Sequence, residues 1–272
     1  MPEAETSGAA PSAAARDRAL LVAAAEAAGQ VALDYQGRAL KTWDKDAGQG
    51  PVSEADLAVN AVLAEQLRTA RPDYGWLSEE DTDDPARLTT ERVFVVDPID
   101  GTRAFLDGQK GFAVALAVVE HGRAVAACVH LPARGETYAA HLGGGATLGE
   151  VPLLASARTS LDGAKAIASK NQLQPEHWPG GVPALDLGWR PALEWRLCLV
   201  ASGRHDLTFT FRPAWEWDIA AGSLIASEAG VRVSDGQGQP LVLNAATPRA
   251  AGLIAAPPAL HTQVLARRSA EP

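Results

Sequence analysis

Cysteine is scarce in this chain, and the two that occur, Cys128 and Cys198, lie inside apolar segments without metal-ligand spacing. We expect both to pack in the core. No apolar run approaches the ~20 residues that a membrane-spanning helix needs. Basic runs that would attract nucleic acid are also missing, and 24 basic against 33 acidic residues give a net charge of −9. Neither membrane nor nucleic acid is therefore an expected partner, and a negatively charged substrate would need local neutralisation, which bound metal ions can provide.

The start of the chain lacks the basic residues and the long apolar run of a secretion signal. Residues 1–15 are acidic and rich in Ala, Ser and Pro, so we expect a frayed tail and a cytoplasmic protein. The rest is long enough for two lobes. A change in composition near residues 149–158 suggests an N-terminal α+β lobe over 16–150 and a C-terminal α/β lobe over 151–268, which act as a single functional unit.

Hydrophobic periodicity predicts helices and strands in alternation along the chain, which suggests a layered, mixed α/β architecture. Two strands joined by His121 and Gly122 form an expected hairpin, and glycines 143–145 are expected to close its sheet. The expected helices lie at 16–35, 53–70, 193–201, 218–229 and 259–267. The expected strands lie at 74–77, 93–96, 111–120, 123–131, 137–141, 166–169, 184–187, 205–211, 231–233, 241–243 and 253–255.

The most informative stretch is Val93–Phe105, in which Val-Phe-Val-Val precedes Asp-Pro-Ile-Asp-Gly-Thr. The apolar residues predict a buried strand, and Pro98 is expected to end it because proline fixes φ and lacks an N–H. Asp97 and Asp100 then lie close together without a Lys or Arg between them, and they would raise each other's pKa unless a cation lies between them. Mg²⁺ prefers such oxygen ligands, and backbone N–H groups after Asp100 can hold an anion. The stretch predicts a metal-assisted phosphate site.

Three other interpretations of this stretch are weaker. An ordinary Asp-Gly turn would explain a lone pair of these residues but not a motif with partners elsewhere. A calcium EF-hand loop beginning at Asp97 would place Pro98 second and Gly108 twelfth, where a bidentate glutamate is required. An aspartyl-phosphate phosphatase would need its nucleophile two residues before Asp100, and that position is Pro98.

Acidic residues in three other places are candidate partners, and each also has a structural explanation. Glu79 belongs to an acidic run after a short strand, where it is either solvated or a metal ligand. Asp56 follows Ser53 by three residues, which is the pattern of a helix capping box. Asp218 lies in the first turn of an expected helix, where a carboxylate stabilises free N–H groups.

Taken together, these blocks resemble the signatures of the inositol monophosphatase superfamily. Glu79-Glu80, Asp97–Thr102 and Trp217–Gly222 match its three motifs, and Lys45 with Asp56 matches its N-terminal block. The resemblance extends from about Arg16 to Arg267 and is closest to the bacterial 3′(2′),5′-bisphosphate nucleotidase branch. It implies an α-β-α-β-α sandwich and a Mg²⁺-dependent, lithium-sensitive phosphomonoesterase that is commonly a homodimer.

The resemblance also implies the metal ligands. Glu79, Asp97 and the carbonyl group of Ile99 would hold a first Mg²⁺. Asp97, Asp100 and Asp218 would hold a second, and Glu79 would also contact a weaker third ion. Two ions of this kind can activate water on one side of phosphorus and neutralise the leaving oxygen on the other.

Catalytic and substrate-binding roles follow from the same resemblance. The Thr102 hydroxyl, supported by Asp56, would orient the attacking water, and Glu79 would complete the catalytic set. N–H groups of Gly101 and Thr102 would bind the phosphate. The six histidines are scattered without ligand spacing, and we expect them to be structural or on the surface. The substrate-binding residues implied are Gly101, Thr102, Asp218 and Lys45.

The expected substrate is adenosine 3′,5′-bisphosphate, a by-product of sulfate assimilation, which would lose its 3′-phosphate. Inositol phosphatases of this superfamily carry an acidic residue seven positions before the last metal aspartate, and that position here is Phe211. Trp189 or Trp215 could stack on an adenine, and Arg212 or Lys170 could pair with a second phosphate. The alternatives are an inositol-1-phosphate or other sugar-phosphate phosphatase and a metal-binding regulatory protein without turnover.

Overall fold

A computed structural model describes residues 10–44 and 50–269. The α-helices are α1 (Ala13–Tyr35), α2 (Glu54–Ala70), α3 (Thr102–Leu106), α4 (Leu193–Ala201), α5 (Ala220–Glu228) and α6 (Pro258–Ser269). The strands are β1 (Thr42–Asp44), β2 (Pro51–Ser53), β3 (Gly75–Ser78), β4 (Arg92–Asp100), β5 (Ala113–Glu120), β6 (Arg123–Leu131), β7 (Glu136–His141), β8 (Ala146–Leu148), β9 (Val151–Pro152), β10 (Lys165–Ile167), β11 (Asp186–Gly188), β12 (Thr208–Thr210), β13 (Ala214–Trp215), β14 (Arg232–Ser234), β15 (Arg249–Ala250) and β16 (Leu253–Ala256).

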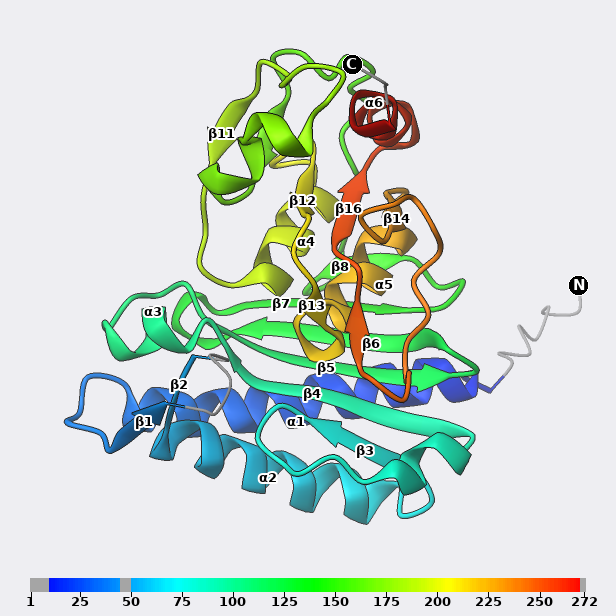
Figure 1. The fold of residues 1–272 in the computed structure, drawn as a ribbon. Coiled ribbons are helices and arrows are strands. Elements are labelled where there is room, and N and C mark those ends of the chain that lie inside the picture. The colour runs from blue at the N-terminus through cyan, green and yellow to red at the C-terminus, as the bar shows by residue number, and fades with distance from the viewer. Residues whose placement is uncertain (1–9, 45–49, 270–272) are drawn as a thin grey trace, which may run out of the picture.

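The elements form five layers (Figure 1). A seven-stranded sheet of order β3-β4-β5-β6-β7-β8-β9 lies between the pair α1 and α2 on one face and the pair α4 and α5 on the other. Beyond α4 and α5 lies a smaller sheet of order β12-β16-β14, with α6 against it. The expected α-β-α-β-α sandwich is therefore confirmed.

Strand β4 lies between two hydrophobic cores because its side chains alternate between the faces of the sheet. Phe94 and Val96 point into the core beneath α1 and α2. Val93 and Val95 point into the core that the sheet forms with α4 and α5. Burial on both faces explains why this strand reads as one continuous apolar run.

Several local predictions are confirmed. Ser53 and Asp56 form a complete capping box at the start of α2. His121 and Gly122 make the two-residue turn between β5 and β6, both with positive φ, at 49° and 76°. That backbone suits a hairpin turn whose twist matches the strands. The two cysteines are buried and unpaired in the hydrophobic cores.

The expectation that β4 ends at Pro98 is wrong. The strand continues to Asp100, and its register on β5 passes from Asp97 opposite Ala115 to Asp100 opposite Ala113. Three steps on β4 against two on β5 make a bulge, where the missing N–H of proline is tolerated. The bulge keeps Asp100 within the buried sheet.

Other boundaries also differ from expectation. Glycines 143–145 do not close the sheet, since β8 and β9 extend it. Residues 241–243 form no strand. The tail is shorter than expected, because α1 begins at Ala13 with Ser12 as its cap; residues 1–9 lie outside the described part. The core around α4 and α5 takes residues from both sides of position 150, so the division into lobes stays an interpretation. Across the described residues, each helix is too short or too polar to cross a membrane.

Helix α2 offers a matched test of the core beneath the sheet. Leu63 is fully buried there, whereas Leu57 on the same helix is 43% exposed. We expect Leu63→Ala to lower the free energy of unfolding by about 2–5 kcal/mol, because it leaves a cavity, and Leu57→Ala to change it by about 0.5 kcal/mol or less. Urea denaturation followed by circular dichroism measures both; similar losses in the two variants would contradict this packing.

Candidate metal centre

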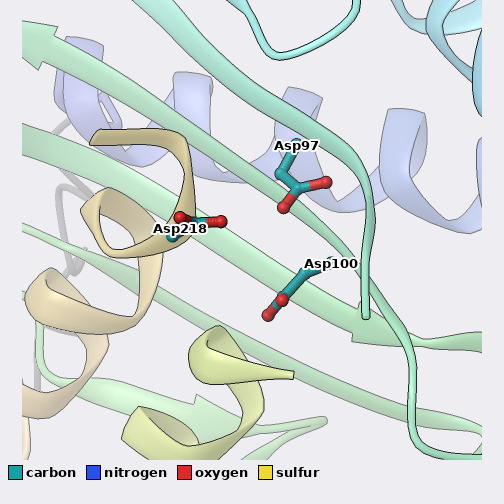
Figure 2. A group of neighbouring side chains, drawn as sticks. All are labelled: Asp97, Asp100 and Asp218. Atoms are coloured by element: carbon teal, nitrogen blue, oxygen red, sulfur yellow. The ribbon is translucent and has the colours of Figure 1, made fainter. Parts of the chain in front are cut away.

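Three carboxylates meet at the end of β4. Asp97 and Asp100 come from the strand, and Asp218 comes from the 3-10 turn η6 (Glu216–Asp218) just before α5. One carboxylate oxygen from each lies within 4.8 Å of the others (Figure 2). Asp218 therefore precedes the helix in which it was expected, and it still reaches the two acids of β4.

Parallel pairing brings a fourth acid to the same place. Strand β3 runs parallel to β4, with Ser78 opposite Val96. Glu79 follows at once, and its N–H donates to the carbonyl group of Val96, 3.1 Å away. Because the carboxyl ends of neighbouring parallel strands meet at one edge of a sheet, Glu79 lies beside Asp97, and both line one cavity.

Burial and mutual repulsion raise the pKa of the acids on β4. Asp97 is buried, and its pKa lies well above the ordinary value because of burial and then the charges of Glu79, Asp100 and Asp218. Burial raises the pKa of Asp100 to about 7, against N–H groups of Leu193 and Glu194 that lower it. The charge of Arg196 also lowers the pKa of Asp100, but burial outweighs these effects.

The donor set fits a hard divalent cation. All its side-chain donors are carboxylate oxygens, which such ions prefer. Oδ1 of Asp97 is buried and has no hydrogen-bond partner among the described residues. An orphaned carboxylate oxygen of this kind, facing other carboxylates, would be satisfied by a bound cation.

Thr102 and Asp56 meet beside the acids. The Thr102 hydroxyl lies 3.3 Å from Oδ1 of Asp56 and 3.1 Å from the carbonyl oxygen of Ile99. Asp56 accepts hydrogen bonds from Ser53 through its other oxygen, so capping α2 and supporting Thr102 use different atoms. Burial raises the pKa of Asp56. The two explanations for this residue are compatible.

Gly101 permits the sharp turn between β4 and α3. Its φ is +93°, a conformation that side chains rarely adopt. A Cβ there would also lie 3.2 Å from the carbonyl oxygen of Gly111. Only glycine suits this position, and it brings Thr102 directly after the two aspartates.

These groups line a cavity of about 610 Å³. Asp56 lies behind Thr102 rather than among the lining residues. The lining residues are Gly50, Pro51, Glu79, Asp97, Ile99, Asp100, Gly101, Thr102, Arg103, Ala104, Asp107, Gln109, Ser169, Trp189, Pro191, Arg196 and Asp218.

Comparison with known proteins identifies the family of this chain. The family model described as "Inositol monophosphatase family" matches residues 15–271. The chain belongs to the inositol monophosphatase family. It is 36% identical over 197 residues to an inositol-1-monophosphatase of Rhizobium meliloti (strain 1021), covering 69% of this chain and 73% of that protein. It is 33% identical over 210 residues to the 3′(2′),5′-bisphosphate nucleotidase CysQ of Shigella flexneri, covering 72% and 80%.

The fold of a solved protein structure supports this family assignment. The extragenic suppressor protein suhB from Bartonella henselae has a TM-score of 0.80 at 26% identity, covering 93% of this chain and 98% of its own. Members of this family are metal-dependent phosphatases that act on small phosphorylated substrates, so this chain is a phosphatase of that family. The two curated relatives differ in the substrate that their names give.

Most of the residues that the family resemblance implied meet in one cavity, although their individual roles stay predictions. Asp56 lies just outside it, in contact with Thr102. Lys45 lies outside the described residues. The residues that line the cavity as expected are Glu79, Asp97, Ile99, Asp100, Gly101, Thr102 and Asp218.

Of the two candidate tryptophans, Trp189 is the one among the described residues that line the cavity. It is 53% exposed and lines the wall. Trp215 instead stacks on Trp217, with ring centroids 4.8 Å apart and planes at 9°, and the guanidinium group of Arg249 lies 4.5 Å from its ring centre. Trp215 is not among the described residues that line the cavity, so this geometry does not favour it as the ring that receives a base.

Phe211 also lies elsewhere. Its ring stacks on Phe209 at 5.2 Å, in the aromatic cluster beside α6, and it is not among the described residues that line the cavity. Arg212 and Lys170 are not among the described lining residues either, although Lys170 directly follows Ser169, which lines the cavity; their pairing with a second phosphate stays a prediction.

Sequence reasoning missed two cavity arginines, Arg103 and Arg196. Arg196 is buried, and its guanidinium group donates to the carbonyl oxygens of Arg190 and Pro191 at 2.6 and 3.3 Å, which holds the loop that carries Trp189. Charged residues within a mainly apolar helix, here Glu194 and Arg196, were the signal that could have identified it.

Asp100 should give the metal-free protein a distinctive pH dependence. Its pKa is about 7 when folded against 3.8 ordinarily, so the folded state binds more protons between these values. The free energy of unfolding should therefore fall as pH rises through this window. Urea denaturation with a chelator present measures the slope, which should be shallower in Asp100→Asn; equal slopes in the two proteins would contradict the shift.

Proposed function

We propose that this chain is a Mg²⁺-dependent phosphomonoesterase that removes the 3′-phosphate from adenosine 3′,5′-bisphosphate. The observation that supports this substrate is the position of Trp189, a half-exposed aromatic ring on the wall of the cavity that holds the acids. A nucleobase offers a flat π-face for stacking on such a ring, and an inositol ring offers none. Lithium sensitivity and a place in sulfate assimilation belong to the same proposal.

Charge in the cavity also supports a bisphosphate. Arg103 is exposed at its rim, on the first turn of α3 beside Thr102. Its planar guanidinium group can bind a second phosphate in a bidentate manner. The substrate's two phosphates would then be divided between the acid-lined floor, neutralised by cations, and this arginine.

Four carboxylates and one carbonyl group are suited to hold the ions. Asp97, Asp100 and Asp218 would share one ion, and Glu79 with Asp97 and the Ile99 carbonyl group another. When bound, Mg²⁺ supplies water activation and neutralisation of the phosphate and leaving oxygens. These candidate ligands come from the ends of two neighbouring strands, β3 and β4, and from the turn before α5.

Thr102 would orient the attacking water. Its single hydroxyl proton is donated to Asp56 or to the Ile99 carbonyl oxygen, and its oxygen retains lone pairs to accept a hydrogen bond from water. Asp56, buried and fixed by Ser53, holds the hydroxyl in that orientation. The N–H groups of Gly101 and Thr102 would bind phosphate oxygens.

A second candidate is an inositol-1-phosphate or other sugar-phosphate phosphatase. The 36% identity to the Rhizobium inositol-1-monophosphatase favours it. Phe211, at the position where the inositol enzymes carry an acid, lies in an aromatic cluster and is not among the described residues that line the cavity, so it does not decide between the two substrates. A regulatory protein without turnover is the less favoured third candidate, because the implied metal ligands and Thr102 all meet in one cavity.

Phosphate release from adenosine 3′,5′-bisphosphate and from inositol 1-phosphate, measured side by side with Mg²⁺, tests the proposal. We expect a higher kcat/KM for the nucleotide. Trp189→Ala should lower that value about 5- to 150-fold, the equivalent of about 1–3 kcal/mol for a base stacked on an aromatic ring. It should leave inositol 1-phosphate turnover nearly unchanged, and Trp189→Phe should restore most of the nucleotide activity.

The other outcomes are equally informative. Preference for inositol 1-phosphate would contradict the nucleotide assignment and favour the second candidate. Equal losses for both substrates in Trp189→Ala would mean that the ring supports the cavity rather than a base. Release from neither substrate, with Mg²⁺ still bound, would favour the regulatory protein.

A further inference from the structure

The carboxylates of the metal centre come from two elements that are distant in sequence. Asp97 and Asp100 belong to β4, whereas Asp218 belongs to the turn before α5. An ion held by all three needs their oxygens at fixed separations. Something must therefore set the position of the start of α5 relative to the end of β4.

The first connection joins β4 to helix α4. Oδ2 of Asp100 accepts the N–H of Glu194 at 2.7 Å, and Oδ1 accepts the N–H of Leu193 at 3.2 Å. These are among the free N–H groups at the start of the helix, which a carboxylate stabilises. The end of β4 is thus attached to the first turn of α4.

The second connection joins α4 to helix α5 in the same way. The Glu194 carboxylate accepts the N–H of Ala221 at 3.1 Å through Oε1 and the N–H of Gly222 through Oε2. The Glu194 side chain is fully buried, so water does not compete for these bonds. A Cβ on residue 222 would clash with Oε2, so glycine at this position is what allows the close approach.

We propose that Glu194 is a positioning residue for the cation site. It attaches the start of α5 to the start of α4, which Asp100 attaches to β4, and Asp218 lies two residues before α5 begins. The series Asp100, Glu194 and the first turn of α5 thereby sets the separation between Asp218 and the acids of β4. This inference rests on the proposed function, because it concerns the site where the ions would bind.

Two substitutions of Glu194 distinguish the effect of its side-chain length from the effect of its charge. Glu194→Gln keeps the length of the side chain but replaces one acceptor by an NH₂ group that faces a backbone N–H. Glu194→Asp keeps the charge but is too short to reach both N–H groups. If Glu194 positions Asp218, both variants should bind Mn²⁺, used as a spectroscopic probe, about 10- to 100-fold more weakly than the wild type, the usual cost of losing a group that orients metal ligands.

Glu228→Gln is a matched control at the other end of α5. Its carboxylate also accepts two backbone N–H groups, those of Gly143 and Gly145 in the loop between β7 and β8. This variant should lose stability and keep the Mn²⁺ affinity of the wild type. A loss of stability alone can therefore be distinguished from a displacement of Asp218.

Electron paramagnetic resonance of free Mn²⁺ during titration of the substrate-free proteins gives the affinities, with far-UV circular dichroism as a check of folding. Wild-type affinity in Glu194→Asp would overturn the inference, because charge alone would then suffice; so would unchanged affinity in Glu194→Gln. If Glu194→Gln does not fold, the Asp variant alone carries the test. Absence of Mn²⁺ binding in the wild type would instead contradict the proposed metal-dependent function.

Discussion

Repulsion among carboxylates buried at one end of β4 is the constraint on which the rest of the site depends. Asp97, Asp100 and Asp218 have oxygens within 4.8 Å of one another, and burial together with like charge raises the pKa of both acids on β4. Such a cluster destabilises a fold unless cations or protons neutralise it. A bound cation would account for such a cluster at the floor of a cavity. The family to which the chain belongs consists of metal-dependent phosphatases.

Backbone geometry brings these charges together. A bulge at Pro98 keeps Asp100 in the sheet, where it meets the N–H groups of α4. Parallel pairing of β3 with β4 brings Glu79 to the same edge. The left-handed conformation of Gly101 turns the chain so that Thr102 faces Asp56. Together these features place the acids and Thr102 on elements that pack in two hydrophobic cores.

Much of this was accessible from the sequence, since periodicity and turn chemistry are local properties. The range of α4, the hairpin at His121 and the capping box at Ser53 were all predicted. The continuation of β4 past Pro98 was not, because a bulge depends on the partner strand. Nor was the choice of Trp189 over Trp215, or the part played by Glu194, since each depends on which segments the tertiary fold brings together. A glutamate inside an apolar helix marks a buried charge, but its partner N–H groups on another helix leave no sequence signal.

The central claim is that the carboxylates at the end of β4 are a cation site, and calorimetric titration of Mg²⁺ into the metal-free protein at neutral pH tests it most directly. Wild type should bind Mg²⁺, and Asp97→Asn should bind it at least about tenfold more weakly. Without metal, the variant should melt at a higher temperature than the wild type, because one of the mutually repelling charges is gone. Equal Mg²⁺ affinity in the two proteins would contradict the account.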